Sequence, residues 1–464
     1  MYKKGGEDAM RIKEAIIYIK LPIKVSEYIR NFIFKNINMR RQIWNDFVEV
    51  YESNKKENEE REKRGEEKKE FRPLQYKTDY FREKEQGRYD EYCVGLSEQV
   101  AIDMHNAMKT IKTNNKKVLD GKSSAKLGEL KFHKRDNYHG SFKVGCKTYE
   151  TRSNNISSRV HILDKNTLSF RVRGKIYGHE EEILTIHLKE DLYDDVIPYD
   201  KHQNEYIRYY KDNPARNECR FRDIDVRMCT FIHELGKFYI QLAIRVLYCI
   251  DKENIKSRYK KLGIDTGIHN PFMCYDGEHD IYTQVEMDNK TSRKIHYLER
   301  RARRIQHAMD KKYNYNIEHG LNPYSNNYKK LLYKFRKIWK KIVNIKRHWS
   351  YNVCKKIVTH YKTIVVDRFN TPDNKDKDIP NKLKRHIDYV NRFHGMYTTN
   401  DILVHMANKY GCEYIKAPKN TTCTCSMCGH KNPHLPLSQR IFKCEECGYE
   451  IDRDMNAAKN CYYM

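Results

Sequence analysis

The pattern of hydrophobic and polar positions predicts two helices and a series of strands in the first half of the chain. Residues 14–22 (EAIIYIKLP) are apolar and rich in isoleucine, which is typical of a strand. Apolar residues recur at helical spacing over residues 25–53 and 96–111, so both segments are predicted helices. Short alternating runs predict further strands at residues 130–133, 141–144, 168–172, 183–188 and 238–246.

A second pattern begins after about residue 259, where strands alternate with helices. Residues 262–265 predict a buried strand, and apolar segments follow near Phe272 and Ile281. Long basic stretches at residues 291–315 and 326–361 predict helices, then a strand at 363–366 and a helix at 399–410. Alternation of this kind favours an α/β sheet. The chain shows no internal repeat.

Residues 55–70 (KKENEEREKRGEEKKE) form a run of mixed charge that has two interpretations. A solvated helix or flexible insertion is favoured, and a specific binding arm is the alternative.

The net charge of the chain indicates the kind of partner, which the hydrophobic pattern does not. The 464 residues include 90 Lys and Arg against 63 acidic residues, a formal net charge of +27. Folding needs no such excess, so the charge indicates a polyanionic partner. The 36 tyrosines could stack on bases, although a biased genome would also produce them. The length suggests roughly three domains.

No segment resembles a signal peptide or a transmembrane helix, so we expect an intracellular protein with no membrane partner. Its 14 cysteines should therefore stay reduced. Nine are scattered singly and are best explained as small buried hydrophobes, whereas five lie between Cys423 and Cys447.

The crowded cysteines predict a structural zinc site. Two C-x2-C pairs, Cys425 with Cys428 and Cys444 with Cys447, are separated by 15 residues, and each is followed by glycine. Four thiolates complete the tetrahedral shell of structural zinc and leave no open position for catalysis. Cys423 is a fifth candidate that does not fit the spacing.

Three acidic residues stand out by context. Asp265 and Asp367 each end an apolar run, and Asp454 opens the last helical segment. Taken singly, each could be a turn residue or a helix cap. Together they could hold the two metal ions that phosphodiester hydrolysis uses, with Mg2+ suited to carboxylates and water.

These motifs resemble the RuvC-like domain of TnpB proteins and compact type V CRISPR effectors. The resemblance rests on the order of GIDTG at 263–267, VVD at 365–367, the paired C-x2-C motifs and DRDMNAA at 452–458. It is strong over about residues 263–460 and looser upstream.

The resemblance implies a multidomain α+β fold. Residues 1–258 would form an amino-terminal β-barrel, the wedge, with a helical recognition region inserted at about 25–125. Residues 259–418 and 449–464 would form an RNase H-like (RuvC) α/β nuclease domain, interrupted by a zinc ribbon at 419–448 that binds target nucleic acid.

The resemblance also implies an RNA-guided, Mg2+-dependent DNA endonuclease, which reads a short DNA motif and cuts in a single site. Asp265, Asp367 and Asp454 would be catalytic and would bind two Mg2+ ions. Asp452 is the neighbouring competitor of Asp454. The family usually has glutamate where this chain has Asp367, a side chain shorter by about 1.5 Å.

Further expectations follow from the resemblance. The partners would be a guide RNA and double- and single-stranded target DNA, with a homodimer possible, and the protein would be cytoplasmic near the nucleoid. The alternatives are a nuclease-inactive, RNA-guided repressor on the same scaffold and a DNA-binding accessory protein without guide RNA.

Overall fold

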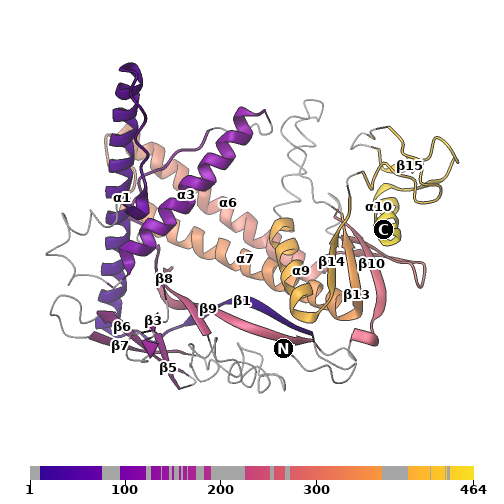
Figure 1. Ribbon diagram of the computed structural model, residues 1–464, viewed down its shortest axis with the longest axis horizontal. Helices are drawn as coiled ribbons and strands as arrows, with labels where there is room; N and C mark the ends of the chain where they lie inside the picture. Colours follow the sequence, from indigo (N-terminus) through magenta and orange to yellow (C-terminus); the bar gives the residue numbers. More distant parts are fainter. Residues whose placement is uncertain are drawn as a thin grey trace. The chain divides into compact units, whose positions relative to one another are not determined.

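The fold is taken from a computed structural model. It describes residues 11–75, 93, 95–121, 127–136, 138–145, 149–150, 156–157, 160–164, 166–173, 182–189, 225–250, 255–266, 272–367, 395–418, 420–433, 435 and 439–464. The chain divides into two compact units (Figure 1): one is Glu14–Leu247, and the other is Tyr248–Met464 together with Met1–Lys13. The predicted domain boundaries stay predictions.

The first unit contains two main sheets that share one hydrophobic core. One sheet has the order β1 (Arg11–Pro22), β9 (Lys237–Ile250), β8 (Asp225–Glu234) and β2 (His139–Gly145). The other has the order β5 (Val160–Asp164), β6 (Thr167–Arg173) and β7 (Glu182–His187), and β3 (Tyr149–Glu150) pairs with β4 (Ile156–Ser157). Phe231 of the first sheet contacts Phe170 of the second edge to face. The strands predicted at 14–22, 141–144, 168–172, 183–188 and 238–246 are confirmed.

The barrel that the resemblance implies is not shown by these strands. An isolated bridge between Ile23 and Leu188 connects the first sheet to the second. The described residues therefore show two sheets that pack on a common core, and they do not show a closed barrel. The mixed α and β content is clear, and the barrel stays a prediction.

The two helices of this unit pack on the same core. Helix α1 (Glu27–Lys63) begins at Ser26, whose hydroxyl accepts from the N–H of Ile29. It continues ten residues past its predicted end, through part of the charged run, where Arg61 pairs with Glu57 one turn earlier. The solvated-helix interpretation therefore holds for this part of the run. Helix α3 (Leu96–Leu119) is likewise longer than predicted.

The prediction of a strand at residues 130–133 is wrong. This segment has no regular secondary structure and pairs with no strand in the residues that the structure describes. Instead, Trp44 of α1 donates its indole N–H to the Lys131 carbonyl, and Asn45 exchanges two hydrogen bonds with the backbone of His133. Side chains of α1 thus satisfy the backbone groups that a neighbouring strand would otherwise satisfy.

The second unit is built on a five-stranded mixed sheet. Its order is β12 (Ile281–Val285), β11 (Phe272–Asp276), β10 (Tyr259–Asp265), β13 (Tyr361–Val366) and β14 (Glu413–Lys416). Strands β12, β11 and β10 are antiparallel neighbours, whereas β10, β13 and β14 run parallel. The predicted α/β character of this region is confirmed.

Helices cover both faces of this sheet. Residues of α7 (Asn326–His360) and α9 (Met396–Tyr410) join Leu262, Ile264, Ile364 and Val366 in one core. Helix α10 (Arg453–Tyr463) contacts β10 and β11 on the other face. Because β10 and β13 are buried on both faces, they read as continuous apolar runs rather than alternating ones. Helix α6 (Asn289–Glu318) pairs with α7 as a long hairpin (Figure 1).

Candidate active site

Asp265 and Asp367 leave the sheet at the same edge. Asp265 is the last residue of β10, and Asp367 directly follows β13. The two strands are parallel neighbours with Ile264 opposite Val366, and the Asp367 N–H donates to the Ile264 carbonyl at 2.8 Å. Successive side chains point to opposite faces of a strand. Asp265 therefore shares the α10 face with Gly263, and Asp367 shares it with Val365.

Asp454 reaches this edge because α10 packs very closely against β10. A Cβ placed on Gly263 would lie 2.5 Å from the backbone nitrogen of Tyr462 and closer still to the Ala458 carbonyl oxygen. Only glycine at 263 permits this approach, and fully buried Ala457 and Ala458 keep the facing side of the helix small. The approach brings the first turn of α10, with Asp454, beside Asp265.

Asp452, and not Asp454, caps this helix. The Asp452 carboxylate accepts from the N–H groups of Asp454 and Met455 at 2.8 and 3.2 Å. An aspartate at the N-cap satisfies free N–H groups of the first helical turn. The Asp454 side chain is thereby left to face the sheet, where it is 5% exposed. This geometry distinguishes the two competitors that the sequence places two residues apart.

The three predicted carboxylates come together. Asp265 is 3% exposed, and its burial, followed by the charges of Asp454 and Asp367, holds its pKa well above the usual range. A side-chain hydrogen bond between Asp265 and Asp367 acts in the same direction. Like charges held together at a buried position are costly without a counter-ion. The cluster therefore has the chemistry of a cation site.

Arg440, a residue that the sequence reasoning missed, forms an ion pair with this cluster. Its guanidinium binds both oxygens of Asp454, at 2.6 and 3.3 Å, and lies 3.6 Å from Asp452. Arg440 directly precedes β15 (Ile441–Lys443), which pairs with β16 (Glu450–Asp452). Arg453 N–H donates to the Arg440 carbonyl, so the hairpin register sets Arg440 beside the start of α10.

The residues present fit a magnesium site. Three carboxylates offer the hard oxygen ligands that Mg2+ prefers. Among the described residues, the adjacent Thr266 hydroxyl is buried and has no hydrogen-bond partner, so it is a candidate donor to a metal-bound water or a substrate oxygen. A metal ion at Asp454 would have to displace or share the bidentate contact with Arg440. Gly267, the last residue of the GIDTG motif, lies outside the described residues.

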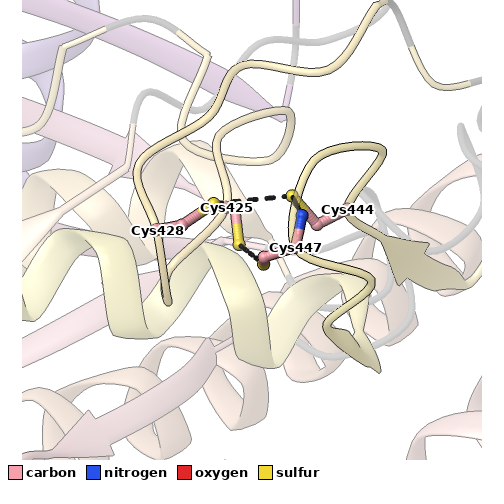
Figure 2. A group of neighbouring side chains, drawn as sticks. All are labelled: Cys425, Cys428, Cys444 and Cys447. Atoms are coloured by element: carbon pink, nitrogen blue, oxygen red, sulfur yellow. Dashed lines mark hydrogen bonds between the residues drawn. The ribbon is translucent and has the colours of Figure 1, made fainter.

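The four predicted zinc ligands meet at one point. The sulfur atoms of Cys425, Cys428, Cys444 and Cys447 all lie within 4.8 Å of one another. Figure 2 shows the four side chains converging from two loops, with Sγ–Sγ distances of 3.7 Å for Cys425–Cys447 and 3.6 Å for Cys428–Cys444. Tetrahedral zinc with Zn–S bonds of about 2.3 Å requires sulfur separations of about 3.8 Å.

Local backbone geometry prepares these loops for a metal. Gly429 and Gly448 have positive φ values of 78° and 71°, so each knuckle uses its glycine to turn. The N–H groups of Met427 and Cys447 point at the sulfurs of Cys425 and Cys444. Hydrogen bonds from the Cys447 N–H, the Glu446 N–H and the neighbouring thiols together lower the pKa of Cys444 to about 6, which favours the thiolate form that binds metal. Cys423 lies outside the group of four, as its spacing predicts.

The first zinc knuckle is hydrogen-bonded to α10, the helix that carries Asp454. Asn456 donates to the Thr424 carbonyl at 2.7 Å and accepts from the Ser426 N–H at 3.0 Å. Asn460, one turn later, donates to the carbonyls of Thr421 and Thr424. Both asparagines are buried. The first zinc knuckle and the candidate active site therefore share α10 as a common support.

Comparisons with known proteins agree with the resemblance. The profile of the Cas12f1-like TNB domain matches residues 397–461, which extend from α9 to α10. TnpB-like protein L79 of Acanthamoeba polyphaga mimivirus is 29% identical over 229 residues, covering 48% of this chain and 40% of that protein. Among the helices described, none is long and apolar enough to cross a membrane.

Two CRISPR-associated relatives match shorter segments. The DNA-binding protein Cas12m of Thermanaerosceptrum fracticalcis is 35% identical over 109 residues, covering 23% of this chain and 18% of that protein. The endodeoxyribonuclease Cas12f1 of Sulfoacidibacillus thermotolerans is 38% identical over 77 residues, covering 16% of this chain and 18% of that protein. Each of these relatives is thus matched over less than half of its own length.

Proposed function

We propose, from the premise that this chain resembles TnpB-like proteins and compact type V CRISPR effectors, that it is an RNA-guided DNA endonuclease. The observation that carries the proposal is the convergence of Asp265, Asp367 and Asp454 at one edge of a mixed sheet. The names of the Cas12m and Cas12f1 relatives supply the substrate class, DNA, and the net charge of +27 suits a polyanionic partner.

The second unit is proposed to be the RuvC-like (RNase H-fold) nuclease domain. Its five-stranded sheet with helices on both faces, and an acidic residue at the ends of two parallel strands, supports this assignment. The proposed boundaries are residues 259–418 and 449–464, with the ribbon at 419–448. Residues 1–258 are proposed to form the wedge and recognition regions that hold the guide RNA.

Within this site the carboxylates are proposed to hold Mg2+. Bound Mg2+ would activate a water and stabilise the charge on the leaving oxygen when water adds to phosphorus and the phosphodiester P–O bond breaks. Asp265 and Asp367 are oriented by the paired strands, and Asp454 is oriented by α10. Arg440 binds the Asp454 carboxylate, and we propose that it contacts a phosphate of the substrate when metal binds.

Zinc is proposed to be structural. The four sulfurs would complete a tetrahedral zinc shell. Two hydrogen bonds of Asn456 connect the first knuckle to the first turn of α10. Asp367 in place of the family's usual glutamate retains a carboxylate at this position. A homodimer is a separate prediction that light scattering of the RNA-bound protein can test.

The experiment that tests the proposal starts from protein expressed together with the RNA of its own flanking locus. Sequencing of the nucleic acid that co-purifies should give one discrete RNA species. The complex should then deplete, from a plasmid library, those targets that pair with the guide and adjoin a short fixed motif. Protein that carries no defined RNA would contradict the proposal. Guide-dependent binding without cleavage would instead support the repressor.

A further inference from the structure

The hairpin of α6 and α7 carries a charge that the active site does not use. Helix α7 contains eleven Lys and Arg and no Asp or Glu, and α6 contains nine basic and three acidic residues. The two helices bury Ile295, Leu298, Ile338 and Ile342 between them. Apart from the part of α7 that packs on the sheet and on α9, the hairpin is therefore a long basic surface, as expected for contact with a polyanion.

One aromatic residue breaks the basic face of α7. The chain has three tryptophans; Trp44 and Trp349 are 7% and 8% exposed, whereas Trp339 is 39% exposed. Trp339 touches Phe335 edge to face, with ring centroids 6.1 Å apart. The broad face of an indole is costly to leave in water. The zinc ribbon and the carboxylate cluster do not account for the exposure of this indole.

Trp339 has one cation and one exposed apolar residue beside it on the helix surface, with Phe335 and the buried Ile342 on its other side. Residues three and four apart on a helix lie side by side. Arg336 and Val343 are therefore adjacent to Trp339, and Arg347 continues the same stripe past Val343. Val343 is 51% exposed, and Arg347 is exposed. The stripe thus combines an aromatic platform with guanidinium groups on both sides.

We infer that this stripe, Arg336, Trp339, Val343 and Arg347, binds a single-stranded segment of nucleic acid, with one base stacked on Trp339 and the flanking phosphates on the arginines. Base stacking on an aromatic residue beside a basic track is how proteins hold single strands without reading sequence. A duplex keeps its bases stacked on one another and offers phosphates alone, so it would use the arginines without the indole. The inference rests on the proposed function and extends it. It adds a binding site for one nucleic-acid strand on α7, the helix that directly precedes β13 and Asp367.

The test measures strand binding directly and needs neither a guide nor cleavage, so it can fail while the proposed nuclease stands. Full-length protein freed of bound RNA is titrated with oligothymidylate in buffer without divalent cations. The tryptophan emission should be quenched, because Trp339 is the exposed indole, and the quenching should be absent in Trp339→Leu. Affinity should fall about 5-fold to 150-fold in that variant, the range for loss of one stacked base.

Matched variants distinguish base stacking from nonspecific apolar binding. Ile281→Ala removes an apolar residue of similar exposure, 53%, from β12 and should leave affinity unchanged. Arg336→Gln and Arg347→Gln should each weaken binding and reduce the salt slope for single strands by about 0.7. An RNA oligomer and a duplex of equal length complete the set. The RNA should behave as the DNA strand does, and duplex binding should be insensitive to Trp339→Leu.

Several outcomes would overturn the inference. Equal affinity of wild type and Trp339→Leu for oligothymidylate would show that the indole makes no contact. Equal dependence of duplex and single strand on Trp339 would exclude base stacking. Failure of acrylamide to reach Trp339 in the free protein would show that another part of the chain covers it. Quenching or a blue shift on anionic vesicles, without any on oligothymidylate, would assign the stripe to lipid.

Discussion

Gly263→Ala tests whether the close contact between β10 and α10 creates the carboxylate cluster. The added Cβ would lie 2.5 Å from the Tyr462 nitrogen and closer to the Ala458 carbonyl oxygen, and both are backbone atoms that cannot rotate away. An ordinary contact needs about 1 Å more room. Helix α10 must therefore move outward, at a cost of about 1–3 kcal/mol for overpacking.

Because α10 carries Asp454, the same shift moves one ligand away from Asp265 and Asp367. A misplacement of about 1 Å at reacting groups can cost about 100-fold in rate. We expect Mg2+-dependent cleavage by Gly263→Ala to fall at least about 100-fold while zinc content and RNA binding stay at wild-type levels. Gly128→Ala is the matched control, because a Cβ there would meet no atom closer than 3.7 Å. Cleavage by Gly263→Ala within about threefold of wild type, at unchanged Tm, would refute the reasoning.

Three further predictions concern single side chains. Asn456→Ala removes two hydrogen bonds to the first knuckle, so zinc should leave the protein faster in a chelator assay; an unchanged rate would mean that α10 does not support the ribbon. Arg440→Gln removes the counter-ion of Asp454, so Mg2+ should bind more tightly by calorimetry even if cleavage falls, and weaker binding would contradict this role. Burial and nearby carboxylates raise the pKa of Asp265, so folding favours its protonated form, and metal-free protein should lose stability as the pH rises from about 4. Asp265→Asn should show a smaller loss of Tm between pH 5 and pH 8 without metal, and an equal loss would show that the carboxylate is not strained.

Much of the second unit could be predicted from the sequence because its signals are local. Strands β10 and β13 are buried on both faces, which leaves continuous apolar runs that end at Asp265 and Asp367. The zinc ligands follow from spacing alone, since each knuckle is one tight turn. That these elements meet could not be read from the pattern. It depends on the parallel pairing of β10 with β13 and on the room that Gly263 leaves for α10.

The errors of prediction also have physical causes. Residues 130–133 have a strand-like pattern, but their backbone groups are satisfied by Trp44 and Asn45 of α1 rather than by another strand. Helix α1 runs on into charged sequence because pairs such as Glu57 and Arg61 support an exposed helix. Arg440 carries no local signal, since its place beside Asp454 depends on the register of β15 with β16.

The most direct test of the central claim is the cleavage of a guide-matched supercoiled plasmid by wild type and Asp265→Asn, with Mg2+ and without it. The account predicts linear or nicked product from wild type with Mg2+ alone. It also predicts no product from Asp265→Asn, although the variant still binds the target with wild-type affinity. Cleavage by Asp265→Asn at the wild-type rate would contradict the claim that these carboxylates form the nuclease site.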